Sequence, residues 1–429
     1  MNCRRRACAV LVAMALLALP TSRLQASGFG IENQGARALG MAGAYTAQAS
    51  DPSAIFYNAA GVAFLKGKRL YLSGGFGSIG ADFTGTGPYP PVGTLEKSVR
   101  QFTVLPSAYY TQQVSETLVL GIGFNAPFGY RTEWQNPDEF TGRYICLDCE
   151  IRSFALNPTV AFKVEDRLAL GFGLDVRFSS LHLSRRLIAD PNPFPEPTDV
   201  AELTIDSGTE TGIGFNAGLL AKLSDSVSLG LAYRHRVNVD YGATGDFQQV
   251  PTGNDAVDDV VAANLPPRQP VLTQVSFPAT WSGGIAIRRG DWTVEGDIVW
   301  WRWATFESVR FNFTETPALS RTLPQNYENT LQGRLGIEYI VNDSWEVRGG
   351  YSYDRSPQPI ETTSPFLHDE DRHGFGVGGS WLSGNVRLDF LFRYLLYRER
   401  ETLGESEYDY EGVYNTDSFQ FGLALGYRF

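Results

Sequence analysis

The sequence predicts an all-β protein, a 14-stranded antiparallel transmembrane β-barrel with an N-terminal plug inside its lumen. Three observations carry this prediction. They are a secretory signal at the start, strands in which large apolar residues alternate with small or polar ones, and long connections that alternate strictly with short ones. Charged residues make up 19% of the 429 residues and 45 residues are Gly, so the chain is poorer in charge and richer in Gly than most soluble domains. The mean hydropathy of −0.17 argues against a bundle of membrane-spanning helices.

The first 26 residues form a secretory signal. Residues 4–6 are three arginines, residues 7–19 form an apolar run, and cleavage is expected between Ala26 and Ser27. The alternative is an uncleaved anchor helix, but the run is too short to span a bilayer comfortably. With a barrel, this signal predicts a Gram-negative outer-membrane location for the mature protein.

The mature chain is acidic. Removing residues 1–26 takes away four of the 36 Lys and Arg residues and none of the 47 Asp and Glu residues, and leaves a net charge of −15. A chain of this charge is a poor nucleic-acid binder, because contacts to phosphates need a cationic surface.

Two cysteines remain after the signal is removed, Cys146 and Cys149 in a lone C-x-x-C. A zinc site needs a second pair of ligands, and a redox motif would open a helix in a βαβ unit; neither surrounds this pair. We expect a small loop disulfide in an oxidising compartment, and no metal or cofactor.

Period-2 alternation runs through the chain after residue 67. It is clearest in residues 419–429, where Phe, Leu and Tyr at odd positions alternate with Gln, Gly, Ala and Arg. Residues 345–352 and 168–179 show the same pattern. The large apolar face would point inward in a soluble sandwich and toward lipid in an outer-membrane barrel, so alternation alone does not choose between them.

The lengths of the connections favour the barrel over the soluble sandwich. Six tight connections rich in Asp, Asn, Ser and Gly, the residues that turns favour, alternate with seven long ones. This arrangement puts all long loops at one end, as in an up-and-down barrel with short periplasmic turns. The fourteen strands are expected near residues 68–81, 98–112, 116–130, 151–164, 167–186, 208–223, 226–247, 271–289, 291–313, 327–341, 344–356, 370–383, 385–399 and 415–429.

Residues 27–67 precede the first strand and show no alternation. Residues 35–49 hold six Ala and three Gly, and such small residues pack closely inside another structure. The alternative is a loose periplasmic tail, which would be more polar. We therefore expect three parts: a signal peptide (1–26), an N-terminal hatch or plug (27–67) and the barrel (68–429).

Several motifs in this order resemble the FadL/TodX (OmpP1) family of outer-membrane transporters of long-chain fatty acids and other hydrophobic compounds. The resemblance covers essentially the whole mature chain. The motifs are Ser27-Gly28-Phe29, Leu39-Gly40-Met41-Ala42-Gly43-Ala44, Asp51-Pro52-Ser53-Ala54, Asn58-Ala59-Ala60-Gly61, Asn125-Ala126-Pro127-Phe128-Gly129, Leu156-Asn157-Pro158, Phe277-Pro278-Ala279-Thr280-Trp281, Val341-Asn342-Asp343-Ser344-Trp345 and Asp354-Arg355-Ser356-Pro357. The family's hatch motif is Asn-Pro-Ala; here Asn58, Ala59 and Ala60 stand in its place, and Ala59 does not fix φ as Pro would.

The resemblance implies uptake of a hydrophobic ligand into an internal apolar pocket, followed by hatch movement and lateral exit at a kink in the third strand. Pro127 removes a donor from the strand ladder and Gly129 relaxes the backbone, which favours a kink there; an ordinary strand end is the alternative. The expected kink residues are Asn125, Pro127, Phe128 and Gly129.

The same resemblance implies ligand-binding residues. For Phe56 and Phe64 packing within the plug is the alternative role, for Arg310 a rim ion pair, and His182 is a second basic candidate for a ligand carboxylate. Charged residues on the lumenal face are expected to pair with each other or with the plug. The expected ligand-binding residues are Phe29, Phe56, Phe64, Trp303, Phe306, Arg310 and His182, and the expected paired charges are Asp175, Arg177, Arg234, Glu338 and Arg348.

Two other classes of protein remain as alternatives. A general diffusion porin would share the barrel but not the plug. A hydrolase would need a nucleophile beside a base, whereas G-x-S-x-G is absent and the four His form no recognisable triad or metal spacing. His368, Asp369 and Glu370 lie in a connection expected to be a solvated charged loop. We expect no enzyme activity and no cofactor.

The expected partners follow from the barrel and the resemblance. They are a hydrophobic small molecule, outer-membrane lipid and lipopolysaccharide, and the barrel-assembly machinery, which would bind through the C-terminal Phe429. The chain is expected to be a monomer, with no nucleic acid bound.

Overall fold

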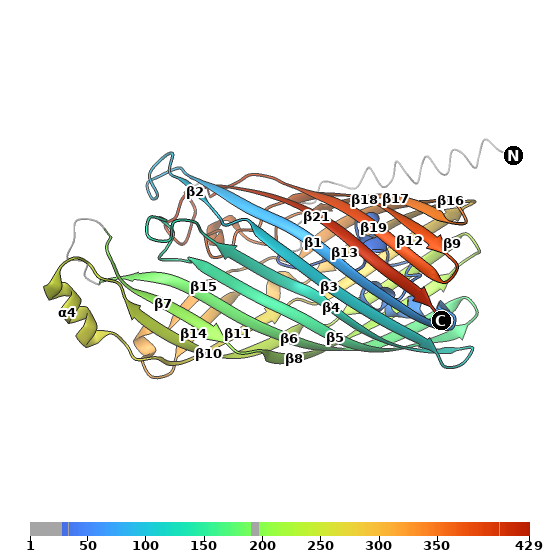
Figure 1. Cartoon of the computed structure of the whole chain (residues 1–429), viewed down its shortest axis with the longest axis horizontal. Coiled ribbons are helices and arrows are strands. Elements are labelled where there is room, and N and C mark those ends of the chain that lie inside the picture. The colour runs from blue at the N-terminus through green and yellow to red at the C-terminus, as the bar shows by residue number, and fades with distance from the viewer. Residues whose placement is uncertain (1–27, 33, 190–196, 403) are drawn as a thin grey trace.

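The computed structural model describes residues 28–32, 34–189, 197–402 and 404–429. The predicted signal peptide lies outside the described residues. In the described part the main strands pair antiparallel with their neighbours, and β1 (Lys68–Gly85) pairs with β21 (Gly412–Arg428), which closes the sheet into a barrel (Figure 1).

Fourteen strands surround the barrel axis, as predicted, when a strand that is broken into two successive segments is counted once. Nine are single strands, and five are divided into two successive segments. The single strands are β1, β3 (Gln101–Gln113), β4 (Leu118–Glu133), β5 (Asp148–Glu165), β6 (Leu168–Ile188), β17 (Trp345–Asp354), β18 (Arg372–Ser383), β19 (Val386–Tyr397) and β21. The divided strands are β7 with β8 (Asp199–Ser207, Glu210–Lys222), β9 with β10 (Val227–Arg234, Val237–Gln249), β11 with β12 (Gln269–Phe277, Thr280–Arg289), β13 with β14 (Trp292–Trp301, Ser308–Phe313) and β15 with β16 (Arg321–Pro324, Thr330–Asn342).

The long connections gather at one end of the barrel and carry the remaining short elements. They are β2 (Leu95–Lys97), α4 (Asp255–Asn264), η3 (Pro317–Leu319), η4 (Ile360–Thr362) and β20 (Arg400–Glu401). Figure 1 shows α4 at the end of the barrel opposite the C-terminus. Short turns occupy the end where β21 finishes, so the predicted alternation of long and short connections is confirmed.

The predicted alternation places large apolar side chains on the outside. In β21, Phe421, Leu423 and Leu425 are 51%, 54% and 42% exposed, whereas Ala424 between them is 5% exposed. An outward apolar face beside an inward small or polar face is the pattern of a barrel embedded in lipid. Among the described residues, no helix combines the length and apolar character needed to cross a membrane.

The N-terminal segment, residues 28–67, lies inside the barrel. Its elements α2 (Ala36–Gly40), α3 (Ala54–Tyr57) and η1 (Ala59–Phe64) are almost entirely buried. Glycines on inward strand faces admit its backbone: a Cβ at Gly171 of β6 would lie 2.3 Å from the carbonyl carbon of Ala59, and one at Gly350 of β17 would lie 2.2 Å from that of Met41. Since β6 and β17 are far apart around the barrel, the segment fills the lumen between them.

Carboxylates of the wall hold this segment through its backbone. The side chain of Asp297 on β13 accepts hydrogen bonds from the amides of Tyr45 (2.9 Å) and Thr46 (3.0 Å), and that of Glu295 accepts one from the amide of Ala47 (2.6 Å). Asn58 donates its side-chain amide to the carbonyl oxygen of Leu219 at 3.0 Å. The plug is thus attached to the wall by polar contacts at several points, not only by packing.

The five lumenal charges named in the sequence analysis are paired, as predicted. Glu338 bonds both Arg37 of the N-terminal segment (2.8 Å) and Arg348 of β17 (2.6 Å). On the other side of the lumen, Asp175 bonds Arg177 (2.9 Å) and Arg234 (2.7 Å). Ion pairs of this kind offset the cost of placing charges in a dry interior only while every partner is present.

Replacing Glu338 with Ala should loosen the N-terminal segment. The change leaves the Arg37 guanidinium buried without its carboxylate, which typically costs about 3–5 kcal/mol. We expect amide hydrogen exchange in residues 36–48 to speed up by more than about tenfold, measured by mass spectrometry on the purified barrel. The control is Asp225→Ala, because Asp225 pairs with Arg167 at the exposed rim. Equal exchange in the two variants would contradict the anchoring role of Glu338.

Candidate functional site

An aromatic cluster surrounds Phe29, close to the start of the described chain. The Phe29 ring centre lies 4.8 Å from that of Trp303, 5.4 Å from Phe306 and 6.1 Å from Phe128, each in an edge-on arrangement. Phe277 completes the group at 6.2 Å. The structure thus brings together three of the expected ligand-binding residues, and it adds Phe128 from the expected kink.

The cluster is part of a larger apolar interior at the extracellular half of the barrel. Besides Phe29 and the four aromatic rings around it, it includes both cysteines and inward-facing residues of β5 to β14. These members include Cys146, Cys149, Ile151, Leu181, Leu183, Leu203, Ile205, Val239, Val275, Val309, Phe311 and Phe313. An apolar lining with few polar groups is typical of a site for hydrophobic ligands.

The beginning of the N-terminal segment pairs with β4 like a short extra strand. Gly30 and Phe128 are antiparallel bridge partners. The Ile31 amide donates to the carbonyl of Pro127 at 2.9 Å, and the Gly129 amide donates to the carbonyl of Phe29 at 3.2 Å. We call residues 28–32 and 34 the N-terminal arm.

The side chain of Gln34 extends this pairing to the next residue of β4. It donates to the carbonyl of Ala126 at 2.6 Å and accepts from the amide of Ala126 at 3.2 Å. The arm therefore satisfies backbone groups of β4 that would otherwise lack a partner in a buried place.

The pairing of β4 with β5 is irregular at the predicted kink. The register shifts between Asn125 and Phe128. Before the shift, Val119 and Asn125 at odd positions face inward; after it, Phe128 and Thr132 at even positions do. An extra residue in one strand exchanges the two faces, and this exchange turns Phe128 toward Phe29 instead of lipid.

The wall between β3 and β4 is open beside this kink. The two strands pair only from Ala108 with Phe124 to Gln113 with Val119. Beyond this paired stretch, toward the end of the barrel that carries the long loops, a cavity of about 510 Å³ is lined by Phe29, Phe128 and Val104 of β3. Val104 is 60% exposed, and it alternates in β3 with the buried Leu105 and Ser107, so the cavity reaches a residue of the outer face of this strand.

Glu32 anchors the arm to the far wall. Its carboxylate bonds Arg334 of β16 at 2.5 Å and Arg393 of β19 at 3.0 Å. Burial alone would raise the pKa of Glu32, but the two guanidinium groups lower it to about 2. The anchor therefore stays charged at every pH that the cell meets, and it lies only three residues after Phe29.

Phe56 and Phe64 do not join the aromatic cluster. The Phe56 ring lies under the Arg234 guanidinium at 4.8 Å, and the Phe64 ring lies 3.8 Å from the ammonium group of Lys222. Both pack on a second apolar cluster, formed by the N-terminal segment and the wall around it. These positions correspond to the alternative role, packing within the plug.

The two basic candidates also lie away from the cluster. Arg310 is exposed on β14, between Val309 and Phe311, which both face inward. The resemblance implied that Arg310 faces the ligand site, whereas in the structure its side chain points away from that site. His182 lies on the outer side of β6 and contacts the Asp206 carboxylate at 2.6 Å, so it too points away from the lumen.

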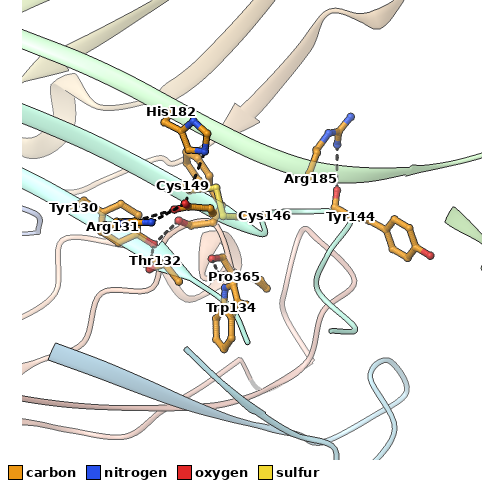
Figure 2. The surroundings of a disulfide bond; sticks show 12 residues. Tyr130, Arg131, Thr132, Trp134, Tyr144, Cys146, Cys149, His182, Arg185 and Pro365 are labelled. Atoms are coloured by element: carbon orange, nitrogen blue, oxygen red, sulfur yellow. Dashed lines mark hydrogen bonds and ion pairs between the residues drawn. A yellow bond between two sulfur atoms is a disulfide. The ribbon is translucent and has the colours of Figure 1, made fainter. Parts of the chain in front are cut away.

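One basic residue at the apolar interior was missed by the sequence reading. Arg185 follows Leu183 on the inward face of β6 and is opposite Leu203 in the register. It donates to the carbonyl oxygen of Tyr144 at 3.2 Å (Figure 2), and among the described residues no carboxylate forms an ion pair with it. Its neighbour Arg186 bonds Asp138, Asp199 and Glu202. The Arg-Arg pair was visible in the sequence, but not which member lacks a partner.

Cys146 and Cys149 form a disulfide in the structure, as the sequence predicted. Figure 2 shows it beside Tyr130, Trp134 and Pro365. The bond closes a short turn at the start of β5, and residues 150–154 of this strand line the cavity. Trp134 links this turn to the connection after β17, because its backbone amide donates to the Leu147 carbonyl at 2.9 Å and its indole N–H donates to the Pro365 carbonyl at 3.1 Å.

A family model described as outer membrane protein transport protein (OMPP1/FadL/TodX) matches residues 17–429. The chain belongs to this family. It is therefore an outer-membrane β-barrel of a family of transport proteins.

Individual relatives are distant but similar in length. The long-chain fatty acid transport protein of Salmonella typhi is 22% identical over 388 residues, which cover 84% of this chain and 85% of that protein. The 47 kDa outer membrane protein of Pasteurella multocida is 24% identical over 96% of both chains.

Solved structures share the fold. A Pseudomonas aeruginosa FadL homologue superposes with a TM-score of 0.81 at 21% identity, covering 94% of this chain and all of the other. The toluene transporter TodX of Pseudomonas putida superposes with a TM-score of 0.68 at 17% identity, covering 93% and 99%. At these identities the likeness supports the barrel architecture alone.

Proposed function

We propose that this protein carries hydrophobic molecules across the outer membrane, and that it releases them sideways through its wall. The observation that carries the proposal is that the N-terminal arm contacts two places at once, the aromatic cluster and β4. The arm contributes Phe29 to the aromatic cluster and, through adjacent backbone groups, pairs with β4 beside the unpaired stretch of the wall. A ligand that enters the cluster therefore competes with Phe29 and acts on the arm.

The energetics favour this exchange for an apolar ligand. Burial of apolar surface contributes about 25 cal/mol per Å², so an alkyl chain or an aromatic ring replaces the Phe29 contacts at little net cost. Displacing Phe29 pulls on the two hydrogen bonds between the arm and β4, from the Ile31 amide to the Pro127 carbonyl and from the Gly129 amide to the Phe29 carbonyl. Once they break, the cavity beside Phe128 and Val104 offers a path from the cluster to the lipid.

A long-chain fatty acid suits the site better than a neutral hydrocarbon because of Arg185. This guanidinium stands on the inward face among apolar residues without a carboxylate partner in the described chain. A fatty acid carboxylate would accept two parallel hydrogen bonds from it, the geometry in which Arg binds carboxylates most strongly. Relatives of this chain carry the name long-chain fatty acid transport protein, which agrees with this choice.

Uptake in cells tests the function itself. A Gram-negative strain without a transporter of this kind, expressing this chain, should take up labelled oleate and toluene faster than the same strain with an empty vector. Uptake of small hydrophilic sugars should stay unchanged, since the lumen is filled. Sugar uptake that rises together with oleate uptake would favour a general diffusion porin.

Arg185→Ala should separate the two ligand classes. Loss of a charge-assisted hydrogen bond typically costs about 1.5–3 kcal/mol, so we expect the affinity for laurate to fall by about tenfold or more. The affinity for toluene should change by less than about twofold, because toluene has no charge to pair. Both are measured by calorimetric titration of the purified protein.

Arg310→Ala is the matched control for this experiment. It removes the same charge from a side chain that points out of the barrel, and it should leave both affinities unchanged. An equal loss of laurate and toluene binding in Arg185→Ala would show that Arg185 acts on the structure and not on the carboxylate.

A further inference from the structure

The connection between β17 and β18 folds into the extracellular mouth of the barrel. We call residues 355–371 the lid loop. Residues 362–367 within it are all buried, and Phe366 and Leu367 belong to the same apolar cluster as Phe29. At the end of this loop the sequence predicts a solvated charged segment around His368, Asp369 and Glu370. That prediction is wrong, because long-range contacts bury the loop.

Neutral hydrogen bonds join the lid loop to two other parts of the chain, the end of β4 and the connection before β16. Trp134 donates to the Pro365 carbonyl (Figure 2) and Tyr130 donates to the Phe366 carbonyl at 2.5 Å. The Thr362 hydroxyl donates to the carbonyl of Gln325 at 2.9 Å. No ionised side chain takes part in these three contacts, so they are indifferent to pH below the range in which Tyr ionises.

Two acids at the end of the lid loop are buried with it. Glu370 is 1% exposed and Asp369 is 8% exposed. One oxygen of Glu370 accepts a hydrogen bond from the Thr416 hydroxyl at 2.8 Å. In the part of the chain that the structure describes, the other oxygen of Glu370 and Oδ2 of Asp369 have no hydrogen-bond partner. Both residues line the 510 Å³ cavity.

Neighbouring charges do not fully compensate these acids. Arg372 and Arg400 lie near both carboxyls, but Arg372 also bonds Asp354, and Arg400 donates to the backbone carbonyls of Asp369 and Gln358. Burial raises the pKa of Asp369 to about 6 and that of Glu370 to about 8. The titratable or charged groups that face them in the described chain are Arg372 of β18, Arg400 of β20, Asp354 of β17, Tyr130 of β4, Tyr327 before β16, Tyr397 of β19, Tyr414 of β21 and His368 of the lid loop.

We propose that residues 355–371 form a pH-dependent lid over the ligand site, closed while Glu370 and Asp369 are protonated and increasingly open as they ionise. The inference concerns the regulation of the transport proposed above and rests on it for its biological meaning. His368 does not oppose the switch, since burial lowers its pKa to about 4 and it stays neutral over the same range.

The direction follows from the protons bound in each state. With the lid closed, Glu370 keeps its proton up to about pH 8; with the lid open, it returns to its ordinary value of about 4.3. Between these values the closed state binds one more proton, so closure weakens by up to about tenfold per pH unit. Above about pH 8 both states are ionised, and no further change is expected. Asp369 adds the same effect only below about pH 6.

The experiment uses a single cysteine in the lid as a reporter. Ser364 is fully buried, and Ser364→Cys introduces a thiol that a membrane-impermeant maleimide reaches only when the lid opens. Cys146 and Cys149 are bonded to each other and do not react. Labelling is measured at pH 6, 7 and 8. Each rate is divided by that of Val92→Cys, which is 81% exposed, to remove the effect of pH on the thiol.

The normalised rate should rise by about tenfold or more from pH 6 to pH 8. In the double variant Ser364→Cys with Glu370→Gln it should change by less than about twofold, because Gln copies the protonated acid and does not ionise. The same rise in the double variant, or no rise in Ser364→Cys alone, would overturn the proposal.

Hydrogen exchange and a comparison of lid opening with transport test the lid independently of the cysteine variants. Hydrogen exchange of residues 362–367 in the unmodified protein, corrected for intrinsic rates, should show the same pH dependence; its absence would overturn the proposal even if a cysteine variant misfolds. Labelling needs no ligand. A protein that carries no fatty acid and still shows the pH-dependent lid would refute the proposed function, whereas a transporter with a pH-independent lid would refute only this inference.

Discussion

Gly171→Val and Gly350→Val are each expected to open a steady pore in a barrel that is otherwise closed. At both positions the added Cβ would lie 2.2–2.3 Å from backbone carbon atoms of the N-terminal segment. Backbone cannot rotate away as a side chain does, so the segment has to shift, and overpacking of this kind costs about 1–3 kcal/mol or more. Single-channel recordings in planar bilayers should show large, lasting currents for both variants and only rare openings for the unmodified protein.

Gly333→Val is the control for these recordings. Gly333 also lies in a spanning strand, but no heavy atom lies within 4 Å of the Cβ that the substitution would add. This variant should behave like the unmodified protein, which shows that Val is tolerated in a strand. Closed channels in Gly171→Val and Gly350→Val, with normal barrel assembly, would mean that the segment does not fill the lumen.

The barrel follows from local properties of the sequence, and for this reason it was predictable. Alternation in residues 419–429 depends only on which side of a strand each residue takes, and tight turns such as Asn342-Asp343 are recognisable from their own residues. The plug was predictable for a similar reason, since its run of Ala and Gly does not fit an outer wall. Neither inference needed a contact between distant residues.

The inside of the barrel was less predictable, because breaks in the strands change which way side chains point. The sequence predicts one strand over residues 291–313, but the structure divides it into β13 and β14, with η2 (Trp303–Thr305) between them. Alternation counted through this break gives no reliable direction for Arg310. The bulge at Asn125 to Phe128 has the same effect on Phe128. In each case the direction depends on pairing with a neighbouring strand.

The lid loop shows a third limit. Its residues look polar, and its burial depends on Tyr130, Trp134 and Gln325, which come from distant parts of the chain. The side chains of Tyr130 and Trp134 donate hydrogen bonds to backbone carbonyls of the loop, and these bonds offset the cost of burying its polar backbone. A reading based on local composition has no means to find such partners, and it missed Arg185 for the same reason.

A disulfide between the N-terminal arm and β4 should stop transport. Gly30 and Phe128 are antiparallel bridge partners, and the Cα atoms of such partners lie about 4.5–5.5 Å apart, within the range that a disulfide spans. In the double variant Gly30→Cys with Phe128→Cys, oxidation fixes the arm over the open stretch of the wall. We expect oleate uptake to fall by about tenfold or more on oxidation and to return on reduction, because the exit requires the arm to leave β4.

Three controls separate the cross-link from its side effects. Phe128→Cys alone reports the loss of the aromatic ring, and Gly30→Cys alone reports any effect on the arm. The unmodified protein with the same reductant reports the effect of opening Cys146–Cys149. If the oxidised double variant transports as fast as the reduced one, the arm does not move and the lateral route is wrong. If transport stops while single-channel recordings stay silent in both states, the ligand leaves through the wall and not along the lumen, since the plug closes the lumen whether or not the arm is fixed.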